Sequence, residues 1–346
     1  MNIDPAPLPA IDLIGVGAPV VDSVAQVPES FLATVSGAKG GMELVDDDTM
    51  RGLLARLPAP PAEATGGSAG NTVQCATRLG LKTSFIGKLG NDAAAGFYRE
   101  SFRRAGVEVT RFKRAELPNA RCLSLVTPDS QRTMRTNLGA ALTLSPADVT
   151  ASDFAGCRHA HFEGYLLFNR ALTLHLLACA KAAGCGISLD LGAHEVVAAN
   201  RAELPALLRE YVRLLVANED EAAVLTGLTG GDAAQTARAL GRLAPVAVLN
   251  LGRRGSLIAA DGELHRITIT PVTPVDTTGA GDSWLAGFLF GWLRGRSLSV
   301  SGHYGALLGA EVVQQVGATI PADRWPVIKR RIQELAETNQ KNAELH

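Results

Sequence analysis

The sequence predicts an α/β fold in which a mostly parallel central sheet carries helices on both faces, with a small β-rich lid beside it. Short apolar runs alternate with segments of helical length through the second half of the chain, which is typical of parallel strands joined by helices. The stretches 18–45 and 107–137 instead hold strand-like runs without helices between those strands, and they predict the lid. With 47% hydrophobic and 19% charged residues, the composition is that of an ordinary globular protein. We expect a single domain over residues 1–346.

Hydrophobic periodicity and punctuating residues predict the elements of the first half. Strands are expected at 11–16, 20–27, 83–86, 107–112, 121–126 and 132–136. Helices are expected at 46–57, 69–79 and 91–105. Asn91 is the expected cap of the third helix, and glycines follow the second and third. Three prolines in 58–61 predict a loop after the first helix.

The second half alternates regularly. Strands are expected at 159–162, 186–191, 214–217 and 246–251, with helices at 171–183, 202–212, 221–226 and 232–243. Asp261-Gly262 predicts a hairpin between strands at 256–260 and 263–270. Three further helices are expected at 280–294, 303–315 and 323–338. Ligands of such folds bind beyond the carboxyl ends of the strands, where a lid would close over a substrate.

Charge and cysteine content narrow the class of partner. The 33 basic and 34 acidic residues leave a net charge of -1, so no global field favours nucleic acid or an anionic membrane. Five cysteines without a Cys-x-x-Cys pattern fit a reducing compartment, and residues 1–10 do not resemble a secretory signal. The most apolar run, 284–293, is too short to span a bilayer. We expect a cytoplasmic protein that acts on a small molecule.

The strongest chemical signal is Asp-Thr-Thr-Gly-Ala-Gly-Asp at 276–282, which precedes a very apolar helix. Glycines let the backbone approach a ligand, and the free N–H groups of a helix start bind anions. An aspartate in that first turn can accept a proton from an attacking hydroxyl, as phosphoryl transfer requires. An isolated Gly-Ala-Gly-Asp could equally be an ordinary helix N-terminus, but the upstream Asp276 favours the functional interpretation.

Four weaker signals accompany this motif. Gly-Gly-Ser-Ala-Gly-Asn at 66–71 opens a helix, and Asp22 follows the first strand. Asn-Glu-Asp-Glu at 218–221 lies at a strand-to-helix junction, and Asn-Leu-Gly-Arg-Arg-Gly at 250–255 follows another strand. Each of them taken alone is as easily a cap, a turn or a hairpin connection. Together and in this order they form one pattern.

This pattern resembles the ribokinase/PfkB family of carbohydrate and nucleoside kinases over about residues 11–330. The resemblance implies that Asp282 is the catalytic base and that the backbone of Gly279, Ala280 and Gly281 forms the anion hole. It further implies three groups of binding residues. The substrate hydroxyls would be bound by Asp22, Gly67 and Asn71, and Mg²⁺ and phosphate by Asn218 and Glu221. The nucleotide would be bound by Asn250, Gly252 and Gly255. A monovalent cation, K⁺, is implied at Asp276 and the Thr278 carbonyl, with the carbonyls of 315–318 opposite.

Within the family, the segments 131–140, 163–165 and 309–313 are most similar to bacterial adenosine-kinase-type members, and Arg132 would then reach the phosphates. The expected activity is therefore transfer of the γ-phosphoryl group of ATP, with Mg²⁺, to adenosine. The alternatives are a sugar kinase for ribose, fructose or 2-keto-3-deoxygluconate, and a non-catalytic sensor on the same fold. Candidate walls for a purine are Phe31, Met42, Leu44 and Met134. The chain is expected as a monomer or as a homodimer through the lid.

The sequence disfavours several other classes of protein and site. Gly15-Val16-Gly17 begins like a dinucleotide fingerprint, but the third glycine is replaced by Val20 and Pro19 opposes a helix start. P-loop and protein-kinase motifs do not occur in the sequence. Cys157, His159 and His161 would share one face of a strand, but their spacing strains a common zinc centre. A buried structural face is the preferred interpretation.

Overall fold

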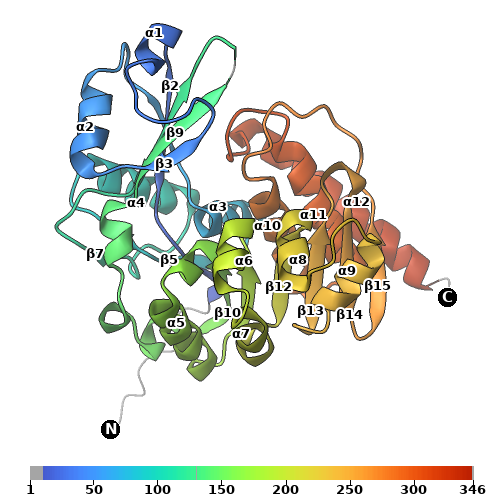
Figure 1. The fold of residues 1–346 in the computed structure, drawn as a ribbon. Helices are drawn as coiled ribbons and strands as arrows, with labels where there is room; N and C mark the ends of the chain where they lie inside the picture. The colour runs from blue at the N-terminus through green and yellow to red at the C-terminus, as the bar shows by residue number, and fades with distance from the viewer. Residues whose placement is uncertain (1–10, 130, 345–346) are drawn as a thin grey trace.

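The computed structural model describes residues 11–129 and 131–344, and its centre is an eight-stranded sheet (Figure 1). Its strands, in spatial order, are β15 (Glu263–Ile267), β14 (Ser256–Ala260), β13 (Val246–Asn250), β12 (Leu214–Asn218), β11 (Gly186–Asp190), β10 (Cys157–Glu163), β1 (Ile11–Val16) and β5 (Thr83–Ile86). All pairs from β5 to β13 are parallel, and β14 and β15 close the sheet as the antiparallel hairpin that Asp261-Gly262 predicts. The predicted fold class is confirmed.

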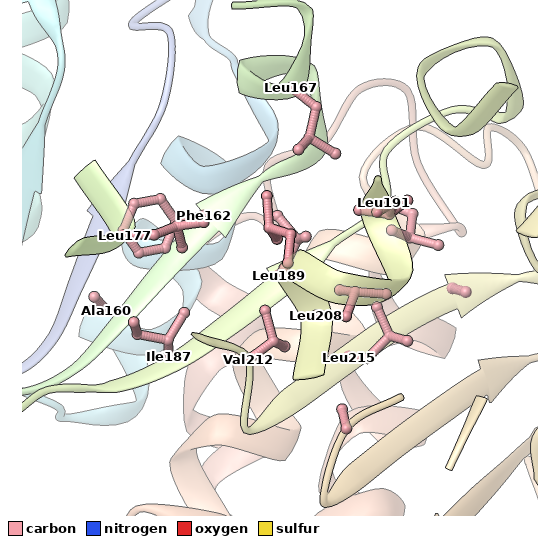
Figure 2. Close-up of a cluster of buried hydrophobic side chains, with 14 of the residues drawn as sticks. Ala160, Phe162, Leu167, Leu177, Ile187, Leu189, Leu191, Leu208, Val212 and Leu215 are labelled. Carbon is pink, nitrogen blue, oxygen red and sulfur yellow. The ribbon is translucent and has the colours of Figure 1, made fainter. Parts of the chain in front are cut away.

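Helices cover both faces because the central strands are apolar on both sides. One face packs against α5 (Arg170–Ala182), α6 (His194–Asn200), α7 (Leu204–Tyr211), α8 (Glu219–Thr226) and α9 (Ala233–Leu240). Figure 2 shows part of this core, where Phe162, Leu177 and Leu189 meet. The other face packs against α3 (Ser68–Leu79), α10 (Ala280–Trp292), α11 (Leu298–Val312) and α12 (Trp325–Glu344). Helix α4 (Ala93–Ala105) lies outside α3, with its aromatic side chains against β5.

Helix α10 is central to the site because it is buried on almost every side. Its residues from Ser283 to Gly291 are buried. Helix α11 can approach closely because Gly287 has no side chain; a Cβ there would lie 2.5 Å from the Tyr304 carbonyl oxygen. A helix fixed by packing around its whole circumference holds its N-terminal turn in one place.

The predicted β-rich lid is present as a second, five-stranded sheet next to the main one (Figure 1). Its spatial order is β3 (Met42–Leu44), β9 (Arg132–Asn137), β8 (Arg121–Val126), β2 (Val21–Gln26) and β4 (Ala62–Thr65). Its bounds differ from the prediction, because β4 lies outside both predicted stretches and 107–120 adds no strand to this sheet. Two helices, α1 (Glu29–Leu32) and α2 (Asp47–Ala55), pack with Leu123 and Leu125 on one of its faces. On the other face, apolar side chains of β3 are exposed.

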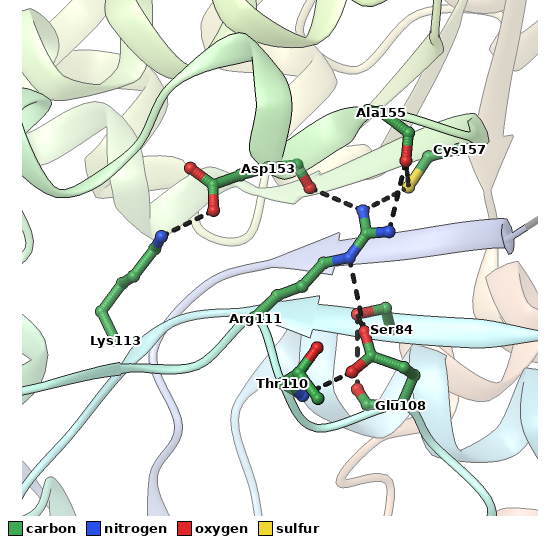
Figure 3. A network of polar contacts seen from close by, with 8 residues as sticks. All are labelled: Ser84, Glu108, Thr110, Arg111, Lys113, Asp153, Ala155 and Cys157. Atoms are coloured by element: carbon green, nitrogen blue, oxygen red, sulfur yellow. Dashed lines mark hydrogen bonds and ion pairs between the residues drawn. The ribbon is translucent and has the colours of Figure 1, made fainter. Parts of the chain in front are cut away.

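The predicted strand at 107–112 is wrong. Glu108 makes a single bridge to Ser84, and the pairing that follows is only the two-residue β7 (Lys113–Arg114) beside β6 (Lys88–Leu89). Side-chain bonds replace the ladder (Figure 3): Arg111 donates to the carbonyl oxygens of Asp153 and Ala155 and pairs with Glu108. Within the segment, the Thr110 N–H donates to the Glu108 carboxylate, a local side-chain bond that competes with strand pairing.

Smaller differences concern element ends and short elements. The cap of α4 is Asp92, whose carboxylate accepts from the Ala95 N–H, and not Asn91. Strands β3, β4, β6 and β7 and helices α1 and α6 were not predicted, because they are short and lack clear periodicity. Helix α1 also corrects the expectation that 18–45 has no helix between its strands. Helix α11 begins earlier than predicted, at a Ser297 cap.

Residues 1–10, in which we saw no secretory signal, lie outside the described residues. In the part of the chain that the structure describes, no helix is both long and apolar enough to cross a membrane.

Candidate active site

The two glycine-containing motifs, far apart in the sequence, meet at the carboxylate of Asp282. Ser68 Oγ donates to Asp282 Oδ1 at 2.7 Å, and Asn71 Nδ2 donates to Oδ2 at 2.8 Å. Thr72 Oγ1 donates to the Asp282 carbonyl oxygen at 3.2 Å. The start of α3 therefore fixes the rotamer of the carboxylate at the start of α10, and both predicted residues Asn71 and Asp282 belong to one site.

The turn before α10 is shaped to leave room for an anion. Gly279 has φ +74°, and a Cβ on it would lie 2.5 Å from the Ala318 Cβ, so no other residue type fits without strain. No side chain caps the helix, and a Cβ added to Gly281 would meet no described atom within 4 Å. The Ala280 N–H donates to the Thr277 carbonyl oxygen at 3.2 Å. Space is open beside Gly281, where the positive end of the helix dipole favours an anion such as phosphate.

Burial perturbs the pKa values of two aspartates in this region, Asp282 and Asp22. It raises the pKa of Asp282 to about 6, against the lowering effect of the Asn71 and Ser68 hydrogen bonds. Burial also raises the pKa of Asp22 to about 6; the Arg132 charge opposes this rise and the Asp282 charge adds to it. Asp22 lies against the glycine-containing loop before α3, since a Cβ on Gly66 would lie 2.2 Å from its Oδ2. The charges of both Arg132 and Asp282 act on the Asp22 carboxyl.

Glu163, at the end of β10, is a site residue that the motif analysis did not assign. Its Oε1 accepts from the Ala18 N–H at 2.8 Å and its Oε2 from the Ala69 N–H at 3.1 Å. One carboxylate therefore joins the loop before Asp22 to the first turn of α3. A Cβ on Gly17 would lie 2.3 Å from Oε2, and burial raises the pKa of Glu163 to about 7.

Polar side chains end the neighbouring strands along the same edge of the sheet. Glu163 is in register with Asp190, and Asn218 with Asn250. Asp190 accepts from the Gly192 N–H at 2.8 Å; burial and the charges of Glu221 and Asp282 raise its pKa well above the usual range. Asp190 was not predicted as a site residue.

Glu221 and Asn218 form a reciprocal cap at the start of α8. Glu221 Oε2 accepts from the Asn218 N–H at 2.9 Å and Oε1 from Asn218 Nδ2 at 2.7 Å, while Asn218 Oδ1 accepts from the Glu221 N–H at 3.0 Å. Burial raises the pKa of Glu221. Among the described residues no three His, Cys, Asp or Glu side chains form a metal cluster. The carboxylates of Asp190, which ends β11, and Glu221, on the first turn of α8 after the adjacent strand β12, are nevertheless groups of the type that holds a hydrated Mg²⁺ shared with substrate phosphates.

The predicted nucleotide loop follows β13. Gly252 has φ +56°, and a Cβ added to it would meet no described atom within 4 Å. Gly255 has φ +86°, and a Cβ there would lie 2.0 Å from the Ile267 carbonyl oxygen, so glycine is required for the turn into β14. Arg254 pairs with Glu219 beside this loop.

Asp276 and Thr278 lie together just before the anion-binding turn. Asp276 Oδ1 accepts from the Thr278 N–H at 3.0 Å and from Thr278 Oγ1 at 2.7 Å; Oδ2 accepts from the Gly317 N–H at 2.7 Å. Arg132 Nη1, from the lid, is 3.0 Å from Oδ2. Burial of Asp276 raises its pKa, but the bonds from Gly317 and Thr278 and the Arg132 charge outweigh this effect, so the pKa is below the usual value.

The histidines of β10 are buried, as the preferred interpretation held. Burial lowers the pKa of His159 and of His161 to about 3, so both are neutral. His159 stacks edge-on against Trp292, and His161 Nδ1 is 3.2 Å from Ser188 Oγ. Both rings therefore serve packing.

Two of the site residues that sequence analysis did not assign share one signal. Glu163 and Asp190 are acidic residues at the last position of an apolar strand, followed within two residues by a glycine. In a parallel sheet this position lies at the ligand-binding edge. Ser68 lies inside the 66–71 motif, but its role as a donor to Asp282 depends on the contact between α3 and α10.

Fold and site together define a kinase that acts on a small molecule. Residues 55–325 match the pfkB family of carbohydrate kinases, and the chain belongs to this family. The aminoimidazole riboside kinase of Salmonella typhimurium is 33% identical over 236 residues, which are 65% of this chain and 72% of that protein. The Arabidopsis thaliana ribokinase is 27% identical over 76% of this chain and 71% of that protein.

Two solved structures are similar over nearly their whole length. The adenosine kinase from Sinorhizobium meliloti is 32% identical, with a TM-score of 0.81 over 93% of this chain and 99% of that chain. A probable sugar kinase from Rhizobium etli CFN 42 is 30% identical, with a TM-score of 0.82 over 94% and 99%. The chain is therefore a phosphotransferase whose acceptor is a nucleoside or a sugar, and the family resemblance is confirmed.

Proposed function

We propose that this kinase transfers the γ-phosphoryl group of ATP to the 5′-hydroxyl of adenosine, giving AMP. The observation that carries the proposal is the exposed apolar surface on the face of the lid that also contains Asp22 and Arg132. A nucleoside needs hydrogen bonds for its ribose and an apolar slot for its base, whereas a free sugar needs only the former.

The register of the lid strands identifies this face. Met42 pairs with Met134, Leu44 with Thr136, and Asp22 with Cys122, and alternate residues of a strand point to opposite faces. Met134 and Arg132 are two residues apart on β9, so both lie on the face that contains Asp22. We name this surface the cleft face; its side chains include Asp22, Val24, Met42, Leu44, Cys122, Arg132 and Met134.

Met42 and Leu44 are 55% and 65% exposed, which is unusual for side chains so apolar. The purine proposal gives them a partner. Phe31, also a candidate wall, instead packs with the core on the opposite face of the lid beneath Arg56. The proposed slot therefore consists of Met42, Leu44 and Met134 and does not include Phe31.

The proposed chemistry follows from the bonds at Asp282. Its carboxylate, oriented by Ser68 and Asn71, takes the proton of the acceptor hydroxyl as the oxygen attacks the γ-phosphorus. The bond from that phosphorus to the β–γ bridging oxygen breaks, and ADP leaves with the electron pair. The backbone of Gly279 to Gly281 binds the transferred group. The ribose hydroxyls are held by Asp22, Gly67 and the side-chain carbonyl oxygen of Asn71.

Asp190, Glu221 and Asn218 are the proposed contacts for a hydrated Mg²⁺, and Asn250, Gly252 and Gly255 those for the nucleotide. The metal, when bound with ATP, would neutralise phosphate charge. K⁺ beside Asp276 and Thr278 is not part of this proposal, because a guanidinium already lies there.

A sugar kinase is the second candidate, because ribokinases are among the relatives. The deciding measurement is kcat/KM with ATP for adenosine, guanosine, inosine, ribose, fructose and 2-keto-3-deoxygluconate. We expect adenosine to exceed every free sugar. A free sugar that is tenfold better, about 1.4 kcal/mol of transition-state preference, would overturn the nucleoside assignment. Absence of transfer to any acceptor would favour the non-catalytic sensor.

A matched pair of variants tests the slot itself. Leu44→Ser should raise the adenosine KM, while Leu142→Ser, at a leucine that is 69% exposed outside the lid, should not. The competing explanation is that the lid's apolar surface binds a second copy of the chain. Under that explanation Leu44→Ser dissociates a dimer and leaves the adenosine KM unchanged, and sedimentation measures the dimer directly.

A further inference from the structure

The Asp276 carboxylate, which the family resemblance implies in K⁺ binding, already accepts hydrogen bonds and already pairs with a positive charge. We propose that the guanidinium of Arg132 is the resident cation of the anion-binding turn and takes the place of K⁺ there. Arg132 then acts as a positioning residue, and the order of the turn depends on the lid that carries it. The inference rests on the proposed function for its link to catalysis, but its structural part stands independently.

Each oxygen of the Asp276 carboxylate already makes two polar contacts. Oδ1 accepts two hydrogen bonds from Thr278, and Oδ2 accepts one from the Gly317 N–H. Arg132 Nη1 completes the set at 3.0 Å from Oδ2 and is also 3.4 Å from Thr278 Oγ1. The guanidinium thus contacts the segment before the turn at two points.

Burial distinguishes this ion pair from an incidental surface contact. The side chains of Arg132 and Asp276 are 27% and 15% exposed, so water screens the pair only in part. A second cation on the same carboxylate would face the guanidinium at close range, and like charges in a partly buried site repel strongly. Arg132 and K⁺ are therefore alternatives at Asp276.

The contact joins two loops to the lid. Asp276 links 275–278 to Gly317, and the N–H groups of Val275 and Asp276 both donate to the Val313 carbonyl oxygen, at 2.7 and 3.2 Å. Ala318, next to Gly317, packs on Gly279 of the turn. The charge that balances this assembly comes from β9, 146 positions away from Thr278. Opening the lid removes that charge, so an ordered anion-binding turn and a closed lid occur together.

Hydrogen exchange without substrates tests the structural part. In wild-type protein the amides of 275–281 and 315–318 should exchange equally in potassium, sodium and tetramethylammonium chloride. In Arg132→Gln they should exchange at least fivefold faster in tetramethylammonium, and potassium should slow them again. Arg132→Lys keeps the charge and should remain indifferent to the salt. The control is Arg121→Gln, which removes a lid arginine that pairs with Glu63 on the opposite face of the lid.

Turnover tests the link to catalysis. Wild-type kcat should be the same within twofold in the three salts. Arg132→Gln should fall at least tenfold in tetramethylammonium and recover at least fivefold with potassium or millimolar guanidinium. A wild-type enzyme that potassium activates more than fivefold, or an Arg132→Gln variant whose exchange at 275–281 is unchanged, would overturn the proposal. Failure of adenosine as acceptor would leave the exchange result intact and would count only against the proposed function.

Discussion

Replacing Ser68 by alanine should move the acidic limb of the pH–rate profile toward higher pH. Asp282 accepts two hydrogen bonds, from Ser68 and from Asn71, and both of them stabilise its ionised form. Because only the ionised carboxylate can take the proton of the acceptor, kcat/KM should rise with pH as Asp282 ionises. The Ser68→Ala substitution removes one of the two bonds and leaves the buried carboxylate easier to protonate.

The size of the effect follows from the strength of the bond. A hydrogen bond to a charged group contributes about 1.5 kcal/mol, which is about one pKa unit. From a pKa of about 6, the limb should therefore move to near 7. At pH 6 the ionised fraction falls from about one half to about one tenth, so kcat/KM drops roughly fivefold; at pH 8 it changes by about 10%.

The assay is kcat/KM against pH between 5 and 9, at constant ionic strength, for wild-type protein and the variant. Thr72→Val is the matched control, because Thr72 donates to the Asp282 carbonyl oxygen and not to its carboxylate. Its limb should coincide with that of the wild type. An equal loss of kcat/KM at pH 6 and pH 8 in Ser68→Ala would refute the reasoning, since it would show that the serine does not act through ionisation.

Three further outcomes follow from the same geometry. Glu163→Gln should raise the KM of the acceptor more than it lowers kcat, because an amide cannot accept from both the Ala18 and Ala69 N–H groups as the two carboxylate oxygens do. An unchanged KM in steady-state kinetics would contradict this role of Glu163. Glu221→Gln should need more Mg²⁺ for half-maximal rate, and excess EDTA should stop turnover of the wild type. His159 has a pKa of about 3 when folded against 6.5 unfolded, so its contribution to stability is lost as pH falls below 6.5. When the pH is lowered from 7 to 4.5, the free energy of unfolding measured in urea should fall by about 2–3 kcal/mol less for His159→Leu than for the wild type. An equal fall in both proteins would contradict this.

Much of the fold was predictable because local signals and tertiary structure agree. The strands of the parallel sheet are short apolar runs, and β10, β11 and β12 each lead into helices before the next strand begins. Prediction failed where side chains replace the backbone ladder, as Arg111 and Glu108 do around 107–112. It also failed at β3 and β4, whose few residues join the lid only because neighbouring strands provide partners.

The site was predictable to the extent that its residues lie in motifs. Gly279, with its positive φ, and Asn71, on the first turn of α3, occupy positions that their residue types suggest. Glu163 is different, because its partners are two backbone N–H groups from distant loops. Such a contact exists only after the sheet has formed, so no local pattern reports it. The Arg132–Asp276 pair likewise depends on how the lid sits on the main sheet.

The role of Asp282 as general base is the centre of the account, and Asp282→Asn tests it most directly. The amide keeps the size of the side chain and cannot take a proton, so the fold should persist, as circular dichroism and the melting temperature would show. We expect single-turnover phosphoryl transfer from ATP to the acceptor to slow by about 10²–10⁴-fold, the usual effect of losing a positioned base. A folded variant that transfers phosphate at a near-normal rate would contradict the account.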